Sequence, residues 1–227
     1  MKSSSALPST RRAAVTAQPN RRERRRVETQ ERIYRAALRI FAERGYLETT
    51  VEDITEAADV GKGTFFNYFP TKEHVLATYG EQRVAAIELA LKKARSANHS
   101  VLGVLKELAT DLAGQSSQSP DLLRSIFAAH LSCAPVRAEL QNRLQRARRL
   151  LAEIFVVGQE RGEIRSDRSA ADLARLTHLI LMGVTIAWAL NPDSLLRKSA
   201  ADVWELFFPS LSADITRKGK IQRKARR

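Results

Sequence analysis

Apolar positions along the chain recur mostly with the spacing of amphipathic helices. From Glu28 onward, apolar residues fall at positions i, i+3, i+4, i+7 and i+8, and Gly45 follows this stripe as a residue type that commonly ends helices. The stripe consists of Ile33, Ala36, Ala37, Ile40 and Phe41. Few windows alternate with period two, and almost none are bounded by hairpin turns. The pattern predicts an all-α protein with about nine helices.

Two short helices are predicted between residues 50 and 70. Thr50 and Asp53 have the spacing of a capping box at the start of the first helix. The second covers residues 62–69 and ends before Pro70, because a proline disfavours helical geometry in the residue that precedes it. Thr71 is placed to cap the longer helix that follows.

The chain after residue 96 keeps a helical pattern with interruptions near residues 98–100, 115–119, 133–135, 162–168 and 191–193. Further helices are expected to start at Ser119, which precedes a proline, and at Ser169. The helix from Ala170 to Leu190 is apolar on more than one face, and the helix from Leu196 to Leu211 carries further apolar residues. This surplus apolar surface suits either a subunit interface or a large intramolecular core.

Charge is concentrated at the two ends of the chain. The net charge is +13 over 227 residues. Residues 1–27 contain eight Lys or Arg against Glu23, and residues 214–227 contain seven against Asp214, whereas residues 28–213 hold 23 of each sign. Cationic termini on a neutral core indicate a polyanionic partner such as nucleic acid.

Several classes of protein are disfavoured by composition. Cys133 stands alone, so an intrachain disulfide framework is excluded and a reducing compartment is expected. The basic N-terminal residues precede no apolar run of an export signal. The longest near-continuous apolar stretch, Leu179 to Leu190, is shorter than the roughly 20 residues that cross a bilayer. We therefore expect a soluble, cytoplasmic protein with no membrane partner.

Residues 49–76 join the two short helices through a tight turn, which is the arrangement of a helix-turn-helix. The segment from Arg32 to Leu76 closely resembles the DNA-binding domain of the TetR/AcrR family of bacterial transcriptional regulators. The residues that carry the resemblance are Ile33, Ala36, Phe41, Gly45, Tyr46, Thr49, Thr50, Val51, Ile54, Ala57, Ala58, Val60, Gly63, Thr64, Phe65, Phe69, Lys72 and Leu76. Three positions depart from the family pattern: Asp59 replaces a turn glycine, Gly61 replaces a capping Ser or Thr, and Phe66 replaces a tyrosine whose phenol would bind phosphate.

The resemblance implies a set of DNA contacts. It places Thr49 or Thr50 at a phosphate, a recognition helix in the major groove, and Lys72 at a further phosphate. Lysine can read guanine and asparagine can read adenine, which suits Lys62 and Asn67, whereas Phe65 and Phe69 are expected in the core. The alternative is that the polar residues form a solvated helix face. The expected DNA-binding residues are Thr49, Thr50, Lys62, Gly63, Thr64, Phe66, Asn67, Tyr68 and Lys72.

A basic arm precedes this segment. Residues 28–80 hold six Lys or Arg against nine Asp or Glu, so the helix-turn-helix needs an additional source of attraction for DNA. We expect a disordered arm over residues 1–27 to supply it, entering an adjacent minor groove, and its alternative role is an exposed solubilising run. The arm's clustered cations are Arg21, Arg22, Arg24, Arg25 and Arg26.

The resemblance also implies a homodimer and a small-molecule pocket in the C-terminal helices. The expected organisation is an arm over residues 1–27, a DNA-binding domain over 28–80, a helical effector-binding and dimerisation domain over 81–211, and a basic tail over 212–227. Candidate pocket residues, each with a plain core role as its alternative, are Phe127, His130, Cys133, His178 and Met182.

Catalytic chemistry is not evident. The histidines are widely spaced and form no metal-binding motif, so neither a metal nor a cofactor is expected. Cys133 lies three residues from His130 but has no third orienting group. The sequence favours a homodimeric regulator, a repressor that binds a palindromic double-stranded operator and is released by a small apolar or amphipathic ligand. The alternatives are an architectural DNA-binding protein without effector control and a helical-bundle enzyme.

Overall fold

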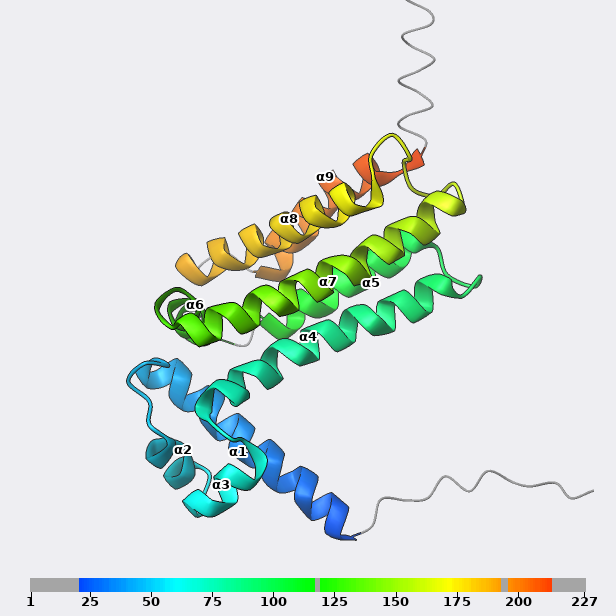
Figure 1. Cartoon of the computed structure of the whole chain (residues 1–227). Helices are drawn as coiled ribbons and strands as arrows, with labels where there is room; N and C mark the ends of the chain where they lie inside the picture. The colour runs from blue at the N-terminus through cyan, green and yellow to red at the C-terminus, as the bar shows by residue number, and fades with distance from the viewer. Residues whose placement is uncertain (1–20, 117–118, 193–195, 214–227) are drawn as a thin grey trace, which may run out of the picture.

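The protein is all-α, as its periodicity predicts (Figure 1). The structure, a computed structural model, describes residues 21–116, 119–192 and 196–213. Within these ranges no strand is formed, and one isolated antiparallel bridge joins Ile164 to Ser212. The helices are α1 (Arg21–Arg44), α2 (Val51–Ala57), α3 (Lys62–Tyr68), α4 (Lys72–Arg95), α5 (Val101–Ser116), α6 (Pro120–Ser132), α7 (Ala134–Glu160), α8 (Ala170–Leu190) and α9 (Leu196–Leu211).

Most predicted helix starts are confirmed by their capping bonds. The hydroxyl oxygens of Ser119 and Ser169 accept hydrogen bonds from backbone N–H groups at the starts of α6 and α8. Thr71 stands at the N-cap of α4 but makes no capping bond. Its hydroxyl oxygen lies 3.0 Å from Nδ1 of His74. The Thr71 hydroxyl therefore pairs with the His74 side chain and not with a backbone N–H group of the first turn.

The prediction of a disordered arm is wrong for residues 21–27, because α1 begins at Arg21. Arginine and glutamate are good helix formers, and Glu23 lies in the first turn, where a negative charge is favourable. The apolar stripe that begins at Ile33 anchors α1, and the upstream turns continue it as an exposed helix. Residues 1–20 and 214–227, which contain the rest of the predicted arm and nearly all of the predicted tail, lie outside the described residues.

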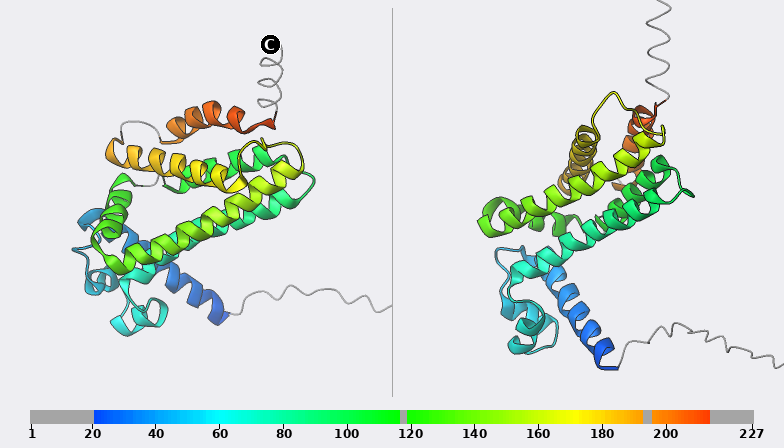
Figure 2. Two further views of the ribbon diagram at one scale, coloured as in Figure 1. Left: turned by 45° about the horizontal axis from the view of Figure 1, so that its top comes forward. Right: turned by 45° about the vertical axis from the view of Figure 1, so that its right-hand side comes forward.

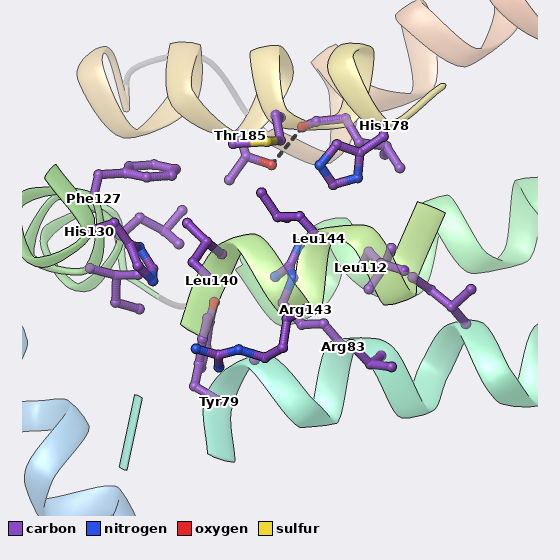
Figure 3. Close-up of a pocket in the computed structure, with 18 of the residues that line it drawn as sticks. Tyr79, Arg83, Leu112, Phe127, His130, Leu140, Arg143, Leu144, His178 and Thr185 are labelled. Atoms are coloured by element: carbon purple, nitrogen blue, oxygen red, sulfur yellow. Dashed lines mark hydrogen bonds between the residues drawn. The ribbon is translucent and has the colours of Figure 1, made fainter. Parts of the chain in front are cut away.

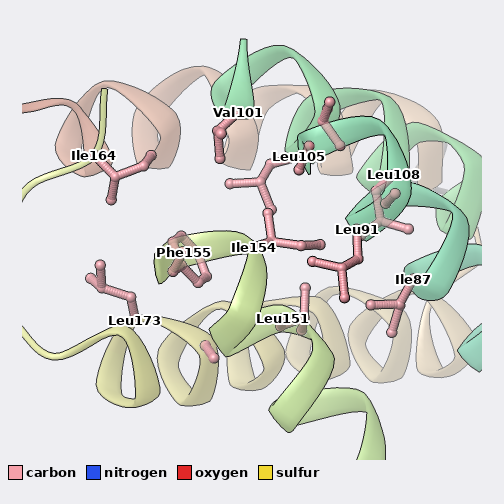
Figure 4. Close-up of a cluster of buried hydrophobic side chains, with 14 of the residues drawn as sticks. Ile87, Leu91, Val101, Leu105, Leu108, Leu151, Ile154, Phe155, Ile164 and Leu173 are labelled. Atoms are coloured by element: carbon pink, nitrogen blue, oxygen red, sulfur yellow. The ribbon is translucent and has the colours of Figure 1, made fainter. Parts of the chain in front are cut away.

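Two hydrophobic clusters organise the molecule, and α4 passes through both. The first packs α1, α2 and α3 against α6 and the start of α4, where it includes Leu76. The second joins α4, α5, α7, α8 and α9 around Leu151, Ile154 and Phe155 (Figure 4). Figure 2 shows α1 to α3 as a unit at one end of the molecule, with α4 running from that unit into the bundle. The domain boundary proposed at residue 80 therefore falls inside a continuous helix.

Candidate nucleic-acid interface and internal cavity

The joint between α2 and α3 has the predicted helix-turn-helix chemistry. Thr50 caps α2, and its backbone N–H donates to the Asp53 carboxylate at 2.8 Å, which completes the capping box. Asp53 also accepts from Arg44 at 2.6 Å, tying α2 to the end of α1. Asp59 adopts the left-handed conformation with φ of 50°, and Gly61 begins α3 without a side-chain cap. The two departures in the turn are therefore accommodated by the backbone.

Helix α3 separates its aromatic residues from its polar ones. Phe65 and Phe69 are buried in the first cluster, as predicted, which fixes the orientation of the helix. Phe66 is 50% exposed on the other side. Lys62, Gly63 and Asn67 are exposed, whereas Thr64 and Tyr68 are half-buried. The exposed side chains of Lys62, Phe66 and Asn67 thus lie on the outer surface of α3, whereas Tyr68 also packs against the buried cluster.

A groove runs between the exposed surface of α3 and the first turns of α1. Its α3 wall consists of Thr64, Asn67 and Tyr68. Its α1 wall consists of Arg22, Glu23, Arg25, Arg26 and Thr29. The α1 positions 22, 25, 26 and 29 have the spacing of one helix face. The sequence signal for this face is the helical spacing of these four positions, which becomes visible when the helix is extended upstream of residue 28. Thr29 was not among the residues predicted to bind DNA. Arg21 and Arg24 are exposed outside the groove.

Two residues predicted to contact phosphate, Thr49 and Lys72, instead make hydrogen bonds within the protein. Thr49 is 1% exposed, and its hydroxyl donates to the carbonyl of Gly45 at 2.6 Å, so Thr50 is the threonine available to a phosphate. Nζ of Lys72 donates to the carbonyl oxygens of Tyr46 at 3.0 Å and Thr49 at 2.8 Å. It also lies 4.5 Å from the centre of the Tyr46 ring. Lys72 therefore braces the loop between α1 and α2, and its contact with phosphate stays a prediction.

Lys62 is paired with Glu52 across the helix-turn-helix. The hydrogen bond from Lys62 is the main cause that lowers the pKa of the Glu52 carboxyl. Both side chains are more than half exposed, and exposed pairs contribute little to stability. Lys62 can therefore exchange Glu52 for a DNA acceptor at small cost.

A cavity of about 170 Å³ lies between α4, α5, α6, α7 and α8 (Figure 3). Four of the five candidate pocket residues line it: Phe127, His130, His178 and Met182. Cys133 does not line it. This residue ends α6 and packs instead against the cluster around α1 to α3, because the turn into α7 directs it to that side.

The polar groups of the cavity are mostly basic or neutral. Burial, followed by the charge of Arg143, lowers the pKa of His130 to about 4 against a weaker raising effect of the Ile126 carbonyl. Burial also lowers the pKa of His178. Arg143 was missed by the sequence analysis, although it falls on the apolar stripe of α7 between Leu140 and Ala147. A charged residue on a buried stripe was the signal that could have found it.

Helices α8 and α9 expose apolar side chains. Leu179 is 54% exposed, Leu190 73% and Leu206 82%. By length and composition alone, α8 could cross a membrane. The apolar stretch from Leu179 to Leu190 is too short to predict this, but a longer window of the same helix is also apolar. In the structure α8 packs against α6, α7 and α9. Its exposed leucines form an apolar surface that lacks a cover within the described residues.

Comparisons with known proteins agree with this architecture. The family model described as bacterial regulatory proteins, tetR family, matches residues 33–79. The regulator TcmR of Streptomyces glaucescens is 40% identical over 75 residues, which cover 31% of this chain and 33% of that protein. The repressor KstR of Mycobacterium tuberculosis is 23% identical over 176 residues, 78% of this chain and 76% of KstR. The structure of Thermus thermophilus FadR, a TetR-family transcriptional repressor in complex with lauroyl-CoA, is 34% identical with a TM-score of 0.57, covering 78% of this chain and 92% of that one.

Proposed function

The chain belongs to the TetR family of bacterial regulatory proteins, and from this premise we propose that it is a homodimeric, cytoplasmic repressor released from DNA by an amphipathic ligand. The observation that carries this proposal is the shared use of two residues. Leu76 of α4 and Ile126 of α6 belong both to the hydrophobic cluster beneath the helix-turn-helix and to the lining of the cavity. A ligand in the cavity therefore contacts side chains that also support α1 to α3.

We propose that α3 enters the major groove with Asn67 and Lys62 at base edges. The arginines of the α1 groove then face the phosphates beside the recognition helix. Residues 21–80 hold eleven Lys or Arg against ten Asp or Glu, so the helical extension of α1 offsets the acidic balance of residues 28–80. In this arrangement α1 supplies attraction that is independent of base sequence.

A second copy of the chain is the proposed cover for the apolar surface of α8 and α9. An isologous pair of these helices would bury Leu179, Leu190 and Leu206 and present two recognition helices related by a two-fold axis. Such symmetry matches a palindromic operator with half-sites on one face of the duplex.

Ligand release follows from linkage between the cavity and the orientation of α3. A ligand that prefers the conformation with misplaced recognition helices lowers operator affinity by its preference ratio, and a ratio of about 100 corresponds to about 2.7 kcal/mol. The Thermus thermophilus relative is in complex with lauroyl-CoA. We consequently propose that the ligand of this protein contains an acyl chain, which binds in the apolar cavity.

The function is tested by selecting duplexes from a random pool and measuring their binding by fluorescence anisotropy. We expect a palindromic duplex to be enriched, to bind a dimer, and to be released by lauroyl-CoA. Enrichment of no sequence would contradict a specific regulator, and an unchanged complex at saturating lauroyl-CoA would contradict release by this acyl ligand.

The role of α1 is tested with charge-matched variants of one helix. Replacing Arg25 and Arg26 by Gln removes two groove cations, whereas replacing Arg35 and Arg39 by Gln removes two exposed cations that do not line the groove. We expect the first pair to reduce the slope of log K against log salt by about 2, because each phosphate contact contributes about 0.9. Equal slopes for the two variants would refute the proposed role.

A further inference from the structure

Arg143 joins the cavity to the first turns of α4. Its side chain is 7% exposed, and Nη1 donates to the carbonyl oxygens of Leu76 at 3.1 Å and Ala77 at 2.9 Å. The close crossing of the two helices is possible because residue 80 is glycine, since an added Cβ would meet the guanidinium of Arg143. A permanent cation is therefore fixed between the cavity and the helix that leads to the DNA-binding unit.

The carboxylates near Arg143 do not enclose it. Glu139 approaches Nε of Arg143 at 3.7 Å, and the Glu139 side chain is 52% exposed. Glu81 also acts on Arg143 through its charge, but its carboxylate accepts a hydrogen bond from Arg146 at 3.0 Å. Nη2 of Arg143 makes no hydrogen bond to any of the described residues. Among those residues no Asp or Glu lines the cavity.

Two histidines add unpartnered nitrogen atoms to the same cavity. Nδ1 of His130 and Nε2 of His178 are buried without a hydrogen-bond partner within the described part of the chain. Buried polar atoms ordinarily have partners, so these nitrogen atoms are available to hydrogen-bond a group that enters the cavity. Figure 3 shows His130 and His178 on opposite sides of the cavity, with Arg143 on α7 between them.

We propose that the ligand is an amphipathic anion, with an apolar chain and a carboxylate or phosphate group, and that Arg143 binds the anionic group. This inference rests on the proposed function and specifies its ligand class. A guanidinium presents a planar fork of donors that suits carboxylate and phosphate oxygens. The apolar chain occupies the remainder of the cavity, where the lining is mainly leucine and isoleucine.

Binding of the anion also gives Arg143 a role in transmission. Nη1 makes both bonds to the carbonyls of Leu76 and Ala77, so an anionic group that pairs with both Nη atoms draws Nη1 away from these carbonyls. These two carbonyls accept the helical hydrogen bonds from the N–H groups of Gly80 and Glu81, at the point where α4 leaves the DNA-binding unit. Occupancy of the cavity thus changes the packing of α4 against α7.

The ligand class is tested by calorimetry with decanoate, decyl phosphate and 1-decanol, which share one chain and differ in charge. We expect either anion to bind the full-length protein about tenfold to hundredfold more tightly than the alcohol, as a charge-assisted hydrogen bond predicts. The comparison of decanoate with decyl phosphate distinguishes the two anionic groups. Equal or tighter binding of 1-decanol, or no binding of any of the three, overturns the inference.

The residue is tested with Arg143→Met, and Arg95→Met serves as the matched control. Arg95 also bridges α4 and α7, through Glu153, but it does not line the cavity. We expect Arg143→Met to abolish the preference for the anion and Arg95→Met to retain it. Arg143→Lys keeps the charge and should retain part of the preference. A preference unchanged in Arg143→Met overturns the assignment of this residue.

Transmission is read from hydrogen exchange at the amides of Gly80 and Glu81. Decanoate should alter exchange at these amides in the wild type and leave it unchanged in Arg143→Met. No change in a wild-type protein that binds decanoate would overturn the transmission step. Selection of a specific duplex by the unliganded protein remains a separate result, so failure of the ligand inference and failure of the regulator proposal are distinguishable.

Discussion

Replacing Gly80 by Ala tests the contact between Arg143 and α4 through its effect on folding stability. Replacing an ordinary glycine within a helix by alanine stabilises the protein by about 1 kcal/mol. Here the added Cβ would overlap Nη1 of Arg143 and lie 2.9 Å from Cζ, so the guanidinium must move. Moving it removes the bonds to Leu76 and Ala77, each worth about 1.5 to 3 kcal/mol for a charged donor. We expect a net loss of about 2 kcal/mol or more.

The assay is urea unfolding followed by circular dichroism at one fixed protein concentration, because the stability of a dimer depends on concentration. The midpoint should fall without a change in the slope m. In an Arg143→Met background the obstruction is reduced, and Gly80→Ala should then stabilise the protein by about 1 kcal/mol. Stabilisation of the wild-type background by the same amount would refute the argument that Arg143 restricts residue 80.

Three further predictions concern other parts of the molecule. Lys72→Met removes the brace of the loop between α1 and α2, so we expect a loss of about 1 to 3 kcal/mol in urea unfolding and weaker binding to all duplexes alike; wild-type stability would contradict this role. The folded-state pKa of His130 is about 4, below its ordinary value of 6.5, so the unfolded chain binds the proton first and stability falls as pH drops from 6.5 toward 4. The loss is less than about 3 kcal/mol, because solvent screens the partly exposed ring, and a His130→Leu variant with the same pH dependence as the wild type would contradict it. Leu206→Glu should produce monomers in sedimentation velocity, whereas Leu89→Glu, at a leucine exposed on α4, should remain dimeric; a dimeric Leu206→Glu would exclude α9 from the interface.

Most helix boundaries could be predicted from the sequence, because capping residues and glycines mark them locally. Gly45 ends α1 with a φ of 88°, and Thr50 and Asp53 cap α2 as a pair. Prediction was possible because a cap joins groups within three or four positions of one another. The buried and exposed phenylalanines of α3 could be distinguished for the same reason, since helical spacing alone sets which of them share a face.

The start of α1 shows where local reasoning was incomplete. Residues 21–27 carry no apolar stripe, and their composition predicted disorder. Their helical state depends on the turns that follow, because adding a turn to an existing helix is far easier than nucleating a new one. Their position beside α3 depends in turn on the packing of α1 against α2, α4 and α6.

By itself, the sequence determined the all-α class and the pair of short helices through short-range periodicity and caps, and residue identity supplied the resemblance that implies a helix-turn-helix and its DNA-facing residues. Only the tertiary structure decided which polar side chains stay exposed on α3 and which bond within the protein. Lys72 reaches carbonyls more than 20 positions earlier in the chain, and Arg143 reaches carbonyls more than 60 positions earlier. The partners of a long side chain depend on which helices pack beside it, and that packing arises from burying many apolar faces at once. The cavity has the same origin, since its lining comes from five helices that no local pattern brings together.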